Sequence, residues 1–490
     1  MTISDATGFR TEAGRPPAAP VRAPGTAPGP VPVATGLDRA ELTARYLAEV
    51  ARRGVPASEV MAAYPSSGGF GSVYEDRFLS RPLFLGHHEQ QQLSADLANL
   101  RAALVSLPDK LYGGDLAGFA RAVGMSSLQV SAVLRSRGTT ASMQCRADLY
   151  TDRTGFKLLE LNLGSAIAGI DNSDMCQALL AHPVIGEFAQ THRLGYVDAM
   201  RDQAHDMFLT SRRPPGSRPV LVTVDWPSSY PILESYMRHF AGRLREYGFD
   251  SHICHIGQLE VRDGRVWLGE VPVDVIQRLF MVEDILEHPD APALMDPILN
   301  AAARGEVKIF TPMDAELFAS KGALAILSDE ANRHLFPAEV LASLDRILPW
   351  TRMVRPGPVT LEDGARVDLL DYALTHQHDL ALKPTLRHSG QGVLLGWHPD
   401  TSPQTWQEQV RGALAGPFVL QRRIRPVPEL FPTDGGDPVP WIINWGVFTL
   451  INGYGGVLAR GTSVESQIEV IHIEGGAYSG CCLHGLPDPA

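Results

Sequence analysis

The chain has 490 residues, of which 44% are hydrophobic and 20% charged, with a formal net charge of −12. This length and composition are typical of a globular protein with more than one lobe, and the acidic balance argues against general nucleic-acid binding. The five cysteines form no CxxC pair and no cluster with histidine, so zinc and disulfide frameworks are not expected. Because no apolar run is long enough to span a membrane and no signal-peptide pattern is present, we expect a cytoplasmic location and no membrane partner.

The N-terminal part begins with a stretch rich in Pro, Ala and Gly, residues 13–36. Such a composition buries too little apolar surface to offset the entropy of ordering, so residues 1–36 are expected to form a disordered tail. From Leu37 the apolar residues follow helical spacing, and the helix in "HHEQQQLSADLANLRAALVSLP" is expected to end before Pro108. Residues 37–215 are predicted to be a helical region that also contains a polar hairpin.

A β-branched run, "GSRPVLVTVDWP", changes the pattern at residue 216. An amphipathic helix, a strand at "DSHICHI", a hairpin around Asp263-Gly264 and a strand at "VDVIQRLF" follow it. This alternation predicts a parallel, three-layer α/β unit over residues 216–310. The unit lacks GxGxxG after its first strand, so we do not expect it to bind a dinucleotide.

The remaining segments predict two further parts, residues 311–440 and residues 441–490. The first contains a helix that begins near Lys321, then "DLALKPTLRHSGQGVLLG" as strand, glycine loop and strand, and "GPFVLQRRIRP" as another strand. In the second, two strands flank Asn452-Gly453, which is a strong hairpin signal.

Polar residues interrupt an apolar pattern in "CRADLYTDRTGFKLLELNLG", residues 145–164. Two strands joined at "TDRTG" would place Arg146 and Asp148 on one face of the first strand, and Glu160 and Asn162 on one face of the second. If Asp148 lies opposite Glu160 the four groups converge, whereas a slip of one residue would separate the two pairs. The other face of the second strand would then direct three leucines into a core: Leu159, Leu161 and Leu163.

The hairpin residues suit metal and phosphate chemistry. Carboxylates from Asp148 and Glu160 with the amide of Asn162 form a hard, oxygen-only set of the kind that Mg²⁺ prefers when phosphates supply further ligands. Arg146 beside them suits a phosphate or a developing negative charge. A partly exposed hairpin whose polar groups satisfy one another is the structural alternative.

A second candidate site combines Lys383 with the small loop "HSGQG". Backbone N–H groups of such a loop can cover phosphates while a lysine supplies charge, although an ordinary hairpin turn has the same pattern. Lys321 at a helix start and Arg460 at the end of a strand are further candidate cations, and each is equally compatible with a surface charge. The loop residues are His388, Ser389, Gly390, Gln391 and Gly392.

The order of these motifs resembles the ATP-grasp ligases in the circularly permuted form of glutathionylspermidine synthetase, over about residues 144–462. The family has R-x-D and then E-x-N, a lysine at a helix start, a "KP" strand before a glycine-rich lid, a strand ending in Gln, and a G-x-x-x-R strand. The matching segments here are "RAD", "ELN", "SKGALAIL", "LKPTLRHSGQGV", "FVLQ" and "GGVLAR". Ordinary ATP-grasp proteins carry the metal-binding carboxylates last, whereas here they come first.

The resemblance implies an α+β or α/β protein: a circularly permuted ATP-grasp fold with a Rossmann-like subdomain and a helical N-terminal region. It implies ATP and Mg²⁺ as cofactors, with the metal on Asp148, Glu160 and Asn162. Arg146 and Arg460 would act catalytically by stabilising the transferred phosphoryl group. The implied ATP contacts are Lys321, Lys383, Gln421 and the loop His388, Ser389, Gly390, Gln391 and Gly392.

By the same resemblance we expect an ATP-dependent carboxylate–amine ligase that proceeds through an acyl phosphate, with amino-acid or peptide-like substrates, possibly in bacterial specialised metabolism. A phosphotransferase that stops at a phosphorylated product and a non-catalytic nucleotide-binding protein stay open, as does a homodimer. The chain departs from the family in the segment "NLGSAIAGIDN" after the hairpin and at His388, and it lacks the peptidase domain. Glutathione and spermidine are therefore not predicted as substrates.

Overall fold

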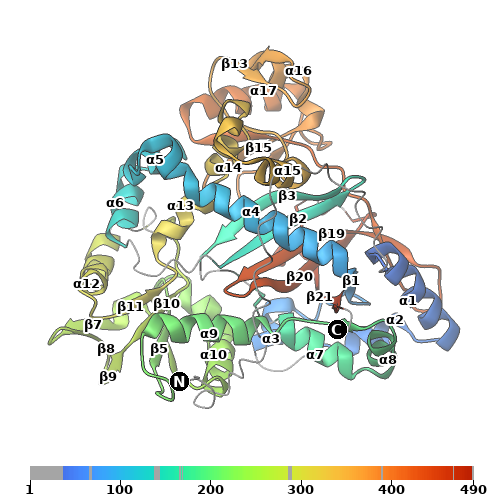
Figure 1. Ribbon diagram of the computed structural model, residues 1–490, viewed down its shortest axis with the longest axis horizontal. Helices are drawn as coiled ribbons and strands as arrows, with labels where there is room; N and C mark the ends of the chain where they lie inside the picture. The colour runs from blue at the N-terminus through green and yellow to red at the C-terminus, as the bar shows by residue number, and fades with distance from the viewer. Residues whose placement is uncertain are drawn as a thin grey trace, which may run out of the picture.

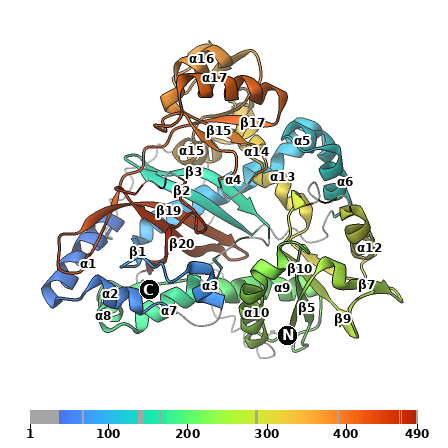
Figure 2. The same ribbon diagram turned by 180° about the vertical axis from the view of Figure 1, so that it is seen from behind.

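The structure is a computed structural model in which the chain surrounds a central sheet (Figures 1 and 2). The predicted tail, residues 1–36, lies outside the described residues. No helix within the described part is long and apolar enough to cross a membrane. The residues that the structure describes are 37–65, 69–136, 144–164, 167, 169–170, 172–284, 288, 290–387, 390–466, 468 and 470–487.

The central sheet joins strands from both ends of the chain. Its order is β1-β21-β20-β19-β2-β3, with β4 paired to β21 and β18 paired to β19. The hairpin β19–β20 turns at Asn452-Gly453 as predicted, because Gly453 supplies the left-handed backbone (φ +99°) that such a turn needs. The strands are β1 (Leu83–Leu85), β2 (Cys145–Asp152), β3 (Gly155–Leu163), β4 (Leu194–Gly195), β18 (Glu429–Phe431), β19 (Val439–Leu450), β20 (Gly453–Ser463) and β21 (Tyr478–Gly485).

One face of the central sheet packs against the long helix α4 (His87–Tyr112), which crosses it diagonally in Figure 1. Leu97 and Leu104 of this helix belong to the same buried cluster as Ala147, Leu161 and Ala459 of the sheet. Side chains alternate along a strand, so the residues between these positions point to the opposite face. That opposite face carries the polar residues of the hairpin.

Helix α4 does not end before Pro108, and the sequence-based prediction of its end is wrong. The helix continues to Tyr112 and closes at Gly113, whose φ is +58° and whose N–H donates to the carbonyl of Pro108. A proline removes one hydrogen bond from a helix. Here Leu104, Leu107 and Pro108 are all buried, and this burial favours continuation of the helix.

Shorter helices surround the opposite face and the edges of the sheet. Of these, α1, α7, α8 and α9 share a second buried cluster with Phe448, Leu450 and Leu458. The helices of this N-terminal region are α1 (Arg39–Arg53), α2 (Ala57–Ala62), α3 (Gly69–Tyr74), α5 (Leu116–Ala122), α6 (Ser127–Arg135), α7 (Asn172–Ala181), α8 (Pro183–Thr191) and α9 (Ala199–Ser211).

A parallel α/β unit follows, and it confirms the alternation expected after residue 216. The sheet order is β11-β10-β5-β6, and every neighbouring pair is parallel. Helix α10 shares one buried cluster with Leu221 and Val275, whereas α12 shares the other with Val222 and Ile276, so the helices cover opposite faces. The elements are β5 (Val220–Asp225), α10 (Tyr230–Glu246), β6 (Asp250–His255), β7 (Leu259–Arg262), β8 (Arg265–Leu268), β9 (Val271–Val273), β10 (Val275–Arg278), α12 (Ala291–Ala303) and β11 (Lys308–Phe310).

A third, four-stranded antiparallel sheet forms the upper part of the molecule in Figure 1 and has its own hydrophobic core. The glycine loop connects β15 and β16, as the sequence predicts. The elements are α13 (Glu316–Ala319), α14 (Lys321–Leu327), α15 (Ala338–Ile347), β12 (Thr351–Met353), β13 (Pro358–Thr360), β14 (Arg366–Asp368), α16 (Leu369–Thr375), β15 (Leu380–Pro384), β16 (Leu394–Leu395), α17 (Pro403–Gly412) and β17 (Phe418–Arg422). The division into separate domains stays a prediction.

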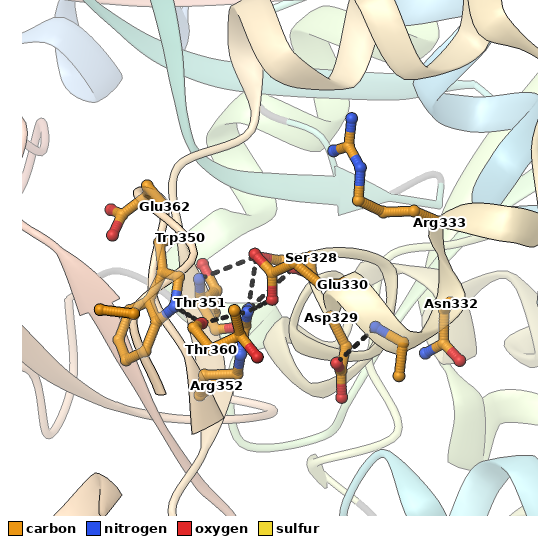
Figure 3. A network of polar contacts seen from close by, with 12 residues as sticks. Ser328, Asp329, Glu330, Asn332, Arg333, Trp350, Thr351, Arg352, Thr360 and Glu362 are labelled. Carbon is orange, nitrogen blue, oxygen red and sulfur yellow. Dashed lines mark hydrogen bonds and ion pairs between the residues drawn. The ribbon is translucent and has the colours of Figure 1, made fainter. Parts of the chain in front are cut away.

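The buried guanidinium of Arg352 fixes this upper sheet to helix α14 (Figure 3). It donates to the carbonyl of Ser328 (2.8 Å), at the end of α14, and to the carbonyl of Thr360 (3.0 Å), and it pairs with Glu330. The backbone N–H of Thr351 donates to the Ser328 hydroxyl (3.0 Å). These contacts hold the end of the helix that begins at Lys321 against strand β12.

Because the upper sheet has its own core, we expect truncation of Leu420 to act locally. Leu420→Ala removes a fully buried side chain and should lower the free energy of unfolding of this part by about 2–5 kcal/mol. Hydrogen exchange should increase over residues 350–422 and stay unchanged in β19 and β20. The matched variant Leu458→Ala, also fully buried, should show the reverse pattern. Equal acceleration in both regions by either variant would contradict a separate core.

Candidate functional site

The hairpin β2–β3 adopts the register in which its polar groups converge. Asp148 lies opposite Glu160, and Arg146 lies opposite Asn162. All four side chains therefore share the sheet face turned away from α4. The alternation of polar and apolar residues predicts that the two residues of each pair share a face, which the structure confirms, and the structure adds the register that the sequence left open.

A β-bulge at Leu159 interrupts the same hairpin and overturns one expectation. Leu149 pairs with Leu158, so Leu159 is the extra residue on β3. Leu158 is fully buried in the core, whereas Leu159 lines a cavity, so the prediction that Leu159 points into the core is wrong. The Leu159 carbonyl accepts hydrogen bonds from Lys383 Nζ (3.3 Å) and Gln421 Nε2 (3.4 Å). The bulge thus connects the central sheet to the upper sheet.

Asp148 is the centre of a buried polar cluster. Its Oδ1 accepts from Arg146 Nε (2.8 Å), and its Oδ2 accepts from Arg146 Nη2 (3.2 Å) and Asn162 Nδ2 (3.1 Å). Arg460 Nη2 lies 2.7 Å from Oδ1. Burial opposes ionisation, but Arg146 and Arg460 outweigh it and hold the pKa of Asp148 well below its usual range. Gly446 lies opposite Asp148, and a Cβ there would stand 2.9 Å from Arg146 Cδ, so a side chain at this position would displace the arginine.

Arg460 and Asn444 carry buried polar atoms that the described protein does not satisfy. Each residue is 6% exposed, and they lie opposite one another on β20 and β19. Arg460 Nε has no hydrogen-bond acceptor among the described residues, and Asn444 Oδ1 has no donor there. Such groups are rare in folded proteins. Because both residues line the same cavity, the unsatisfied Nε donor and Oδ1 acceptor point to a polar ligand.

Asn444 is absent from the predicted site residues. It interrupts the apolar run "WIINWGVF" in the same way that Glu160 and Asn162 interrupt theirs. This pattern could have identified it.

The two predicted lysines lie at the junction of the sheets. Lys321 Nζ is 2.9 Å from Glu160 Oε2 and donates to the carbonyl of Arg387 (2.8 Å). Lys383 Nζ donates to Gln421 Oε1 (2.6 Å) as well as to the bulge carbonyl. Burial lowers the pKa of Lys383 to about 8, with a smaller opposing effect from Glu160 and a further lowering by Lys321. A bound anion would restore the charge of this lysine.

Several of these residues line one cavity of about 790 Å³, a volume that includes open solvent, between the central and upper sheets, whereas Arg146, Asn162 and Lys321 are not part of its lining. Apolar and aromatic side chains line the part away from the charged cluster: Tyr150, Leu395, Trp397 and Ile424. The polar lining includes Asp148, Glu160, Lys383, Gln421, Asn444 and Arg460.

The glycine loop is only partly placed at this cavity. Gly390 lines it, and a Cβ there would stand 2.6 Å from Val470 Cγ1, so the loop packs closely against the segment after β20. Gln391 and Gly392 are exposed and do not contribute to the lining. His388 and Ser389 lie outside the described residues. The proposed lid role of the loop therefore stays a prediction.

The oxygen atoms near the cavity fit Mg²⁺ only as a partial ligand set. No group of three or more His, Cys, Asp or Glu residues in the described ranges could hold a metal ion. The Asp148 oxygens already receive four polar contacts, which leaves Glu160 and the amide oxygen of Asn162 as the better donors. Mg²⁺ commonly takes one or two protein oxygens and completes its shell with phosphate and water. The metal role of Asp148 stays a prediction.

The fold is similar to that of a glutathione synthetase-like effector from Globodera pallida, with a TM-score of 0.51 and 12% sequence identity over 91% of this chain and 98% of that chain. A candidate gamma-glutamylcysteine synthetase from Methylobacillus flagellatus aligns with a TM-score of 0.39 and 12% identity over 77% of this chain and 84% of that chain. No protein-family model and no curated protein matches the sequence. At 12% identity the first of these likenesses shows a shared fold alone, and the sheets and helices of the chain make that fold a mixed α/β one.

Removing the charge of Asp148 should destabilise the protein, because two buried guanidinium groups would lose their partner. We expect Asp148→Asn to lower the free energy of unfolding by about 3–5 kcal/mol, measured by urea denaturation. As a control, Asp400→Asn changes a side chain that is 93% exposed and should cost no more than about 0.5 kcal/mol. Equal stability of the two variants would show that the charge of Asp148 does not contribute to the stability of the fold.

The lowered pKa of Lys383 predicts pH-dependent binding of a phosphate ligand. Lys383 is protonated below about pH 8 and loses its charge above it, so the affinity for MgATP should fall as the pH rises through that value. Calorimetric titrations across this pH range would measure the fall. Lys383→Arg keeps its charge and should remove the step. An equal fall in the variant would assign the pH dependence to another group.

Proposed function

We propose that the protein is an ATP-dependent carboxylate–amine ligase with a permuted ATP-grasp arrangement. The observation that carries this proposal is the buried Arg460, which lines the cavity and whose Nε–H has no acceptor among the described residues. Four cations, Arg146, Arg460, Lys321 and Lys383, meet two carboxylates, Asp148 and Glu160. This excess of positive charge, in a chain with a net charge of −12, favours a polyanionic ligand.

The two parts of the cavity suit the two parts of a nucleotide. The apolar side chains of Trp397 and Leu395 offer contact area to a purine base, and Gln421 lines the same cavity and accepts a hydrogen bond from Lys383. The charged end, with Lys383 and Arg460, suits the triphosphate. Burial lowers the pKa of Lys383, and bound phosphates would raise this pKa again, so that the lysine would be fully protonated in the complex.

Glu160 and Asn162 would hold Mg²⁺ beside the phosphates. The ion would neutralise part of the phosphate charge when bound. Lys321, which now pairs with Glu160, is placed to contact the same phosphates from the start of α14. Asp148 would hold Arg146 and Arg460 in fixed positions rather than bind the nucleotide.

In the proposed reaction a substrate carboxylate attacks the γ-phosphorus of ATP, which gives an acyl phosphate and ADP. An amine then attacks the acyl carbon, so that an amide forms and inorganic phosphate leaves. Arg146 and Arg460 would stabilise the charge on the transferred phosphoryl group. The synthetase-like fold of the Globodera pallida protein is consistent with this class of reaction.

The products of nucleotide turnover test this proposal. With a panel of carboxylates and amines, we expect ADP and phosphate to accumulate only when both substrates are present. Glu160→Gln should reduce this turnover by at least about a hundredfold, because a neutral amide is a poorer ligand for the magnesium nucleotide. The control Glu339→Gln changes an exposed side chain on α15 and should leave turnover unchanged.

Two results would contradict the ligase. Release of AMP and pyrophosphate would indicate adenylation instead of an acyl phosphate. ADP release with a phosphorylated product and no dependence on amine would indicate a phosphotransferase.

A further inference from the structure

A second and larger cavity lies beside the parallel sheet, away from the residues described above. Its volume is about 1440 Å³, part of it open to solvent. It is bounded by α10, by the end of α3, by the loop after β3 and by the carboxyl ends of β5 and β10. Ligands of open α/β sheets commonly bind at the carboxyl ends of the strands.

The walls of this second cavity are mostly apolar. Helix α10 contributes Met237 and Phe240 to the interior, and Ile232 and Leu233 to the mouth. Ile232 is 81% exposed, which is unusual for a large aliphatic side chain next to a cavity. A ligand with an extended apolar group would cover this surface.

The floor of the cavity is polar and buried. Thr223 and Gln277 lie opposite one another on β5 and β10, and the threonine hydroxyl donates to Gln277 Oε1 (2.8 Å). Gln203 of α9 is 1% exposed and donates to Gln144 Oε1 (3.0 Å). The other end of this amide, Gln203 Oε1, has no donor within the described part of the chain. A ligand N–H or O–H group would satisfy it.

The second cavity adjoins the nucleotide cavity along two segments. Residues Val470 to His472 line the first cavity, and the next two residues, Ile473 and Glu474, line the second. Arg77 holds this segment by donating to the carbonyl of Ile473 (2.8 Å). Gly169 of the second cavity packs against Leu458, two residues before Arg460 on β20. A substrate seated in the second cavity is therefore next to the proposed phosphoryl-transfer site.

The charge of the lining distinguishes between the two substrates of a ligase. None of the described residues that line the second cavity is Lys, Arg or His. Two are acidic, Glu75 and Glu474, and both are exposed. Glu75 pairs with Arg77, whereas Glu474 has no ion-pair partner among the described residues. This lining disfavours a carboxylate and favours a cation.

We propose that the second cavity binds the amine substrate, and that this substrate is a primary amine with an extended aliphatic or aromatic group. The inference rests on the proposed ligase function, since it assigns one of the two substrates of that reaction. The acidic mouth attracts the ammonium group, the α10 side chains cover the apolar body, and a second N–H or O–H group at the far end of the substrate donates to Gln203 Oε1.

Matched probes test the assignment without knowledge of the natural substrate. Calorimetry or ligand-observed NMR would compare 4-phenylbutylamine with 4-phenylbutyrate, which share an apolar body and differ in charge. We expect the amine to bind roughly three- to tenfold more tightly, as the exposed and unpaired carboxylate of Glu474 would provide. Titration of MgATP into the same preparation tests the proposed function separately.

Two variants at the mouth distinguish steric from electrostatic effects. Ser235→Trp places an indole over the mouth from an exposed position on α10 and should weaken amine binding at least about tenfold. Glu474→Lys should remove the preference for the amine over the carboxylate. The control Glu408→Lys, exposed on α17, should preserve it. All three variants should bind MgATP like the wild type.

The outcomes separate this inference from the ligase proposal. Amine binding that Ser235→Trp weakens, with MgATP affinity unchanged, supports the assignment. Equal or tighter binding of 4-phenylbutyrate, or absence of amine binding in a protein that binds MgATP, would overturn it. Absence of MgATP binding would overturn the proposed function, whatever the probes show.

Discussion

The buried carboxylate of Asp148 is the contact on which the arrangement of the site depends. It accepts from Arg146 on its own strand and pairs with Arg460, which comes from the other end of the chain. A buried carboxylate is costly unless cations and donors surround it, and buried guanidinium groups have the same requirement. The cluster is therefore stable only when β2, β19 and β20 are assembled side by side. The sheet and its charged face are therefore expected to form together.

The upper sheet is joined to this face by backbone geometry. The bulge at Leu159 provides a carbonyl to Lys383 and Gln421, and Arg352 holds the helix of Lys321 against the same sheet. Lys321 consequently pairs with Glu160, and Lys383 lines the cavity. Cations of α14 and β15 thus lie close to carboxylates of the central sheet. A nucleotide that binds both sheets would stabilise their closed arrangement.

Local pattern was sufficient to predict several parts of this structure. Alternation in "RAD" and "ELN" predicts that Arg146 shares a face with Asp148, and Glu160 with Asn162, because the period of a strand is two. The register that brings the two pairs together could not be predicted. The bulge at Leu159 was not predictable, since one extra residue leaves no mark on an apolar run. The contact of Lys383 with Gln421 depends on long-range strand pairing, and the sequence carries no local signal for it. Pro108 in α4 shows how tertiary burial overrides a helix-ending signal.

Two features arise only from the packing of whole lobes. The unsatisfied atoms of Arg460 and Asn444 are visible because burial removes water from both. The second cavity exists because α10, the loop after β3 and the segment around Ile473 meet without filling the space between them. Neither property belongs to one segment, so neither could be derived from spacing or composition. In the proposed reaction, these two features lie where the amine substrate would meet the acyl phosphate.

The central claim is that the cavity between the two sheets binds a magnesium nucleotide through Arg460. The most direct measurement is calorimetric titration of ATP, with and without Mg²⁺, into the wild type and Arg460→Met, with urea denaturation as a check on folding. The account predicts Mg²⁺-dependent binding by the wild type and a loss of at least about tenfold in the variant, as a charge-assisted contact to phosphate requires. Equal affinity of a folded variant, or no nucleotide binding by the wild type, would contradict it.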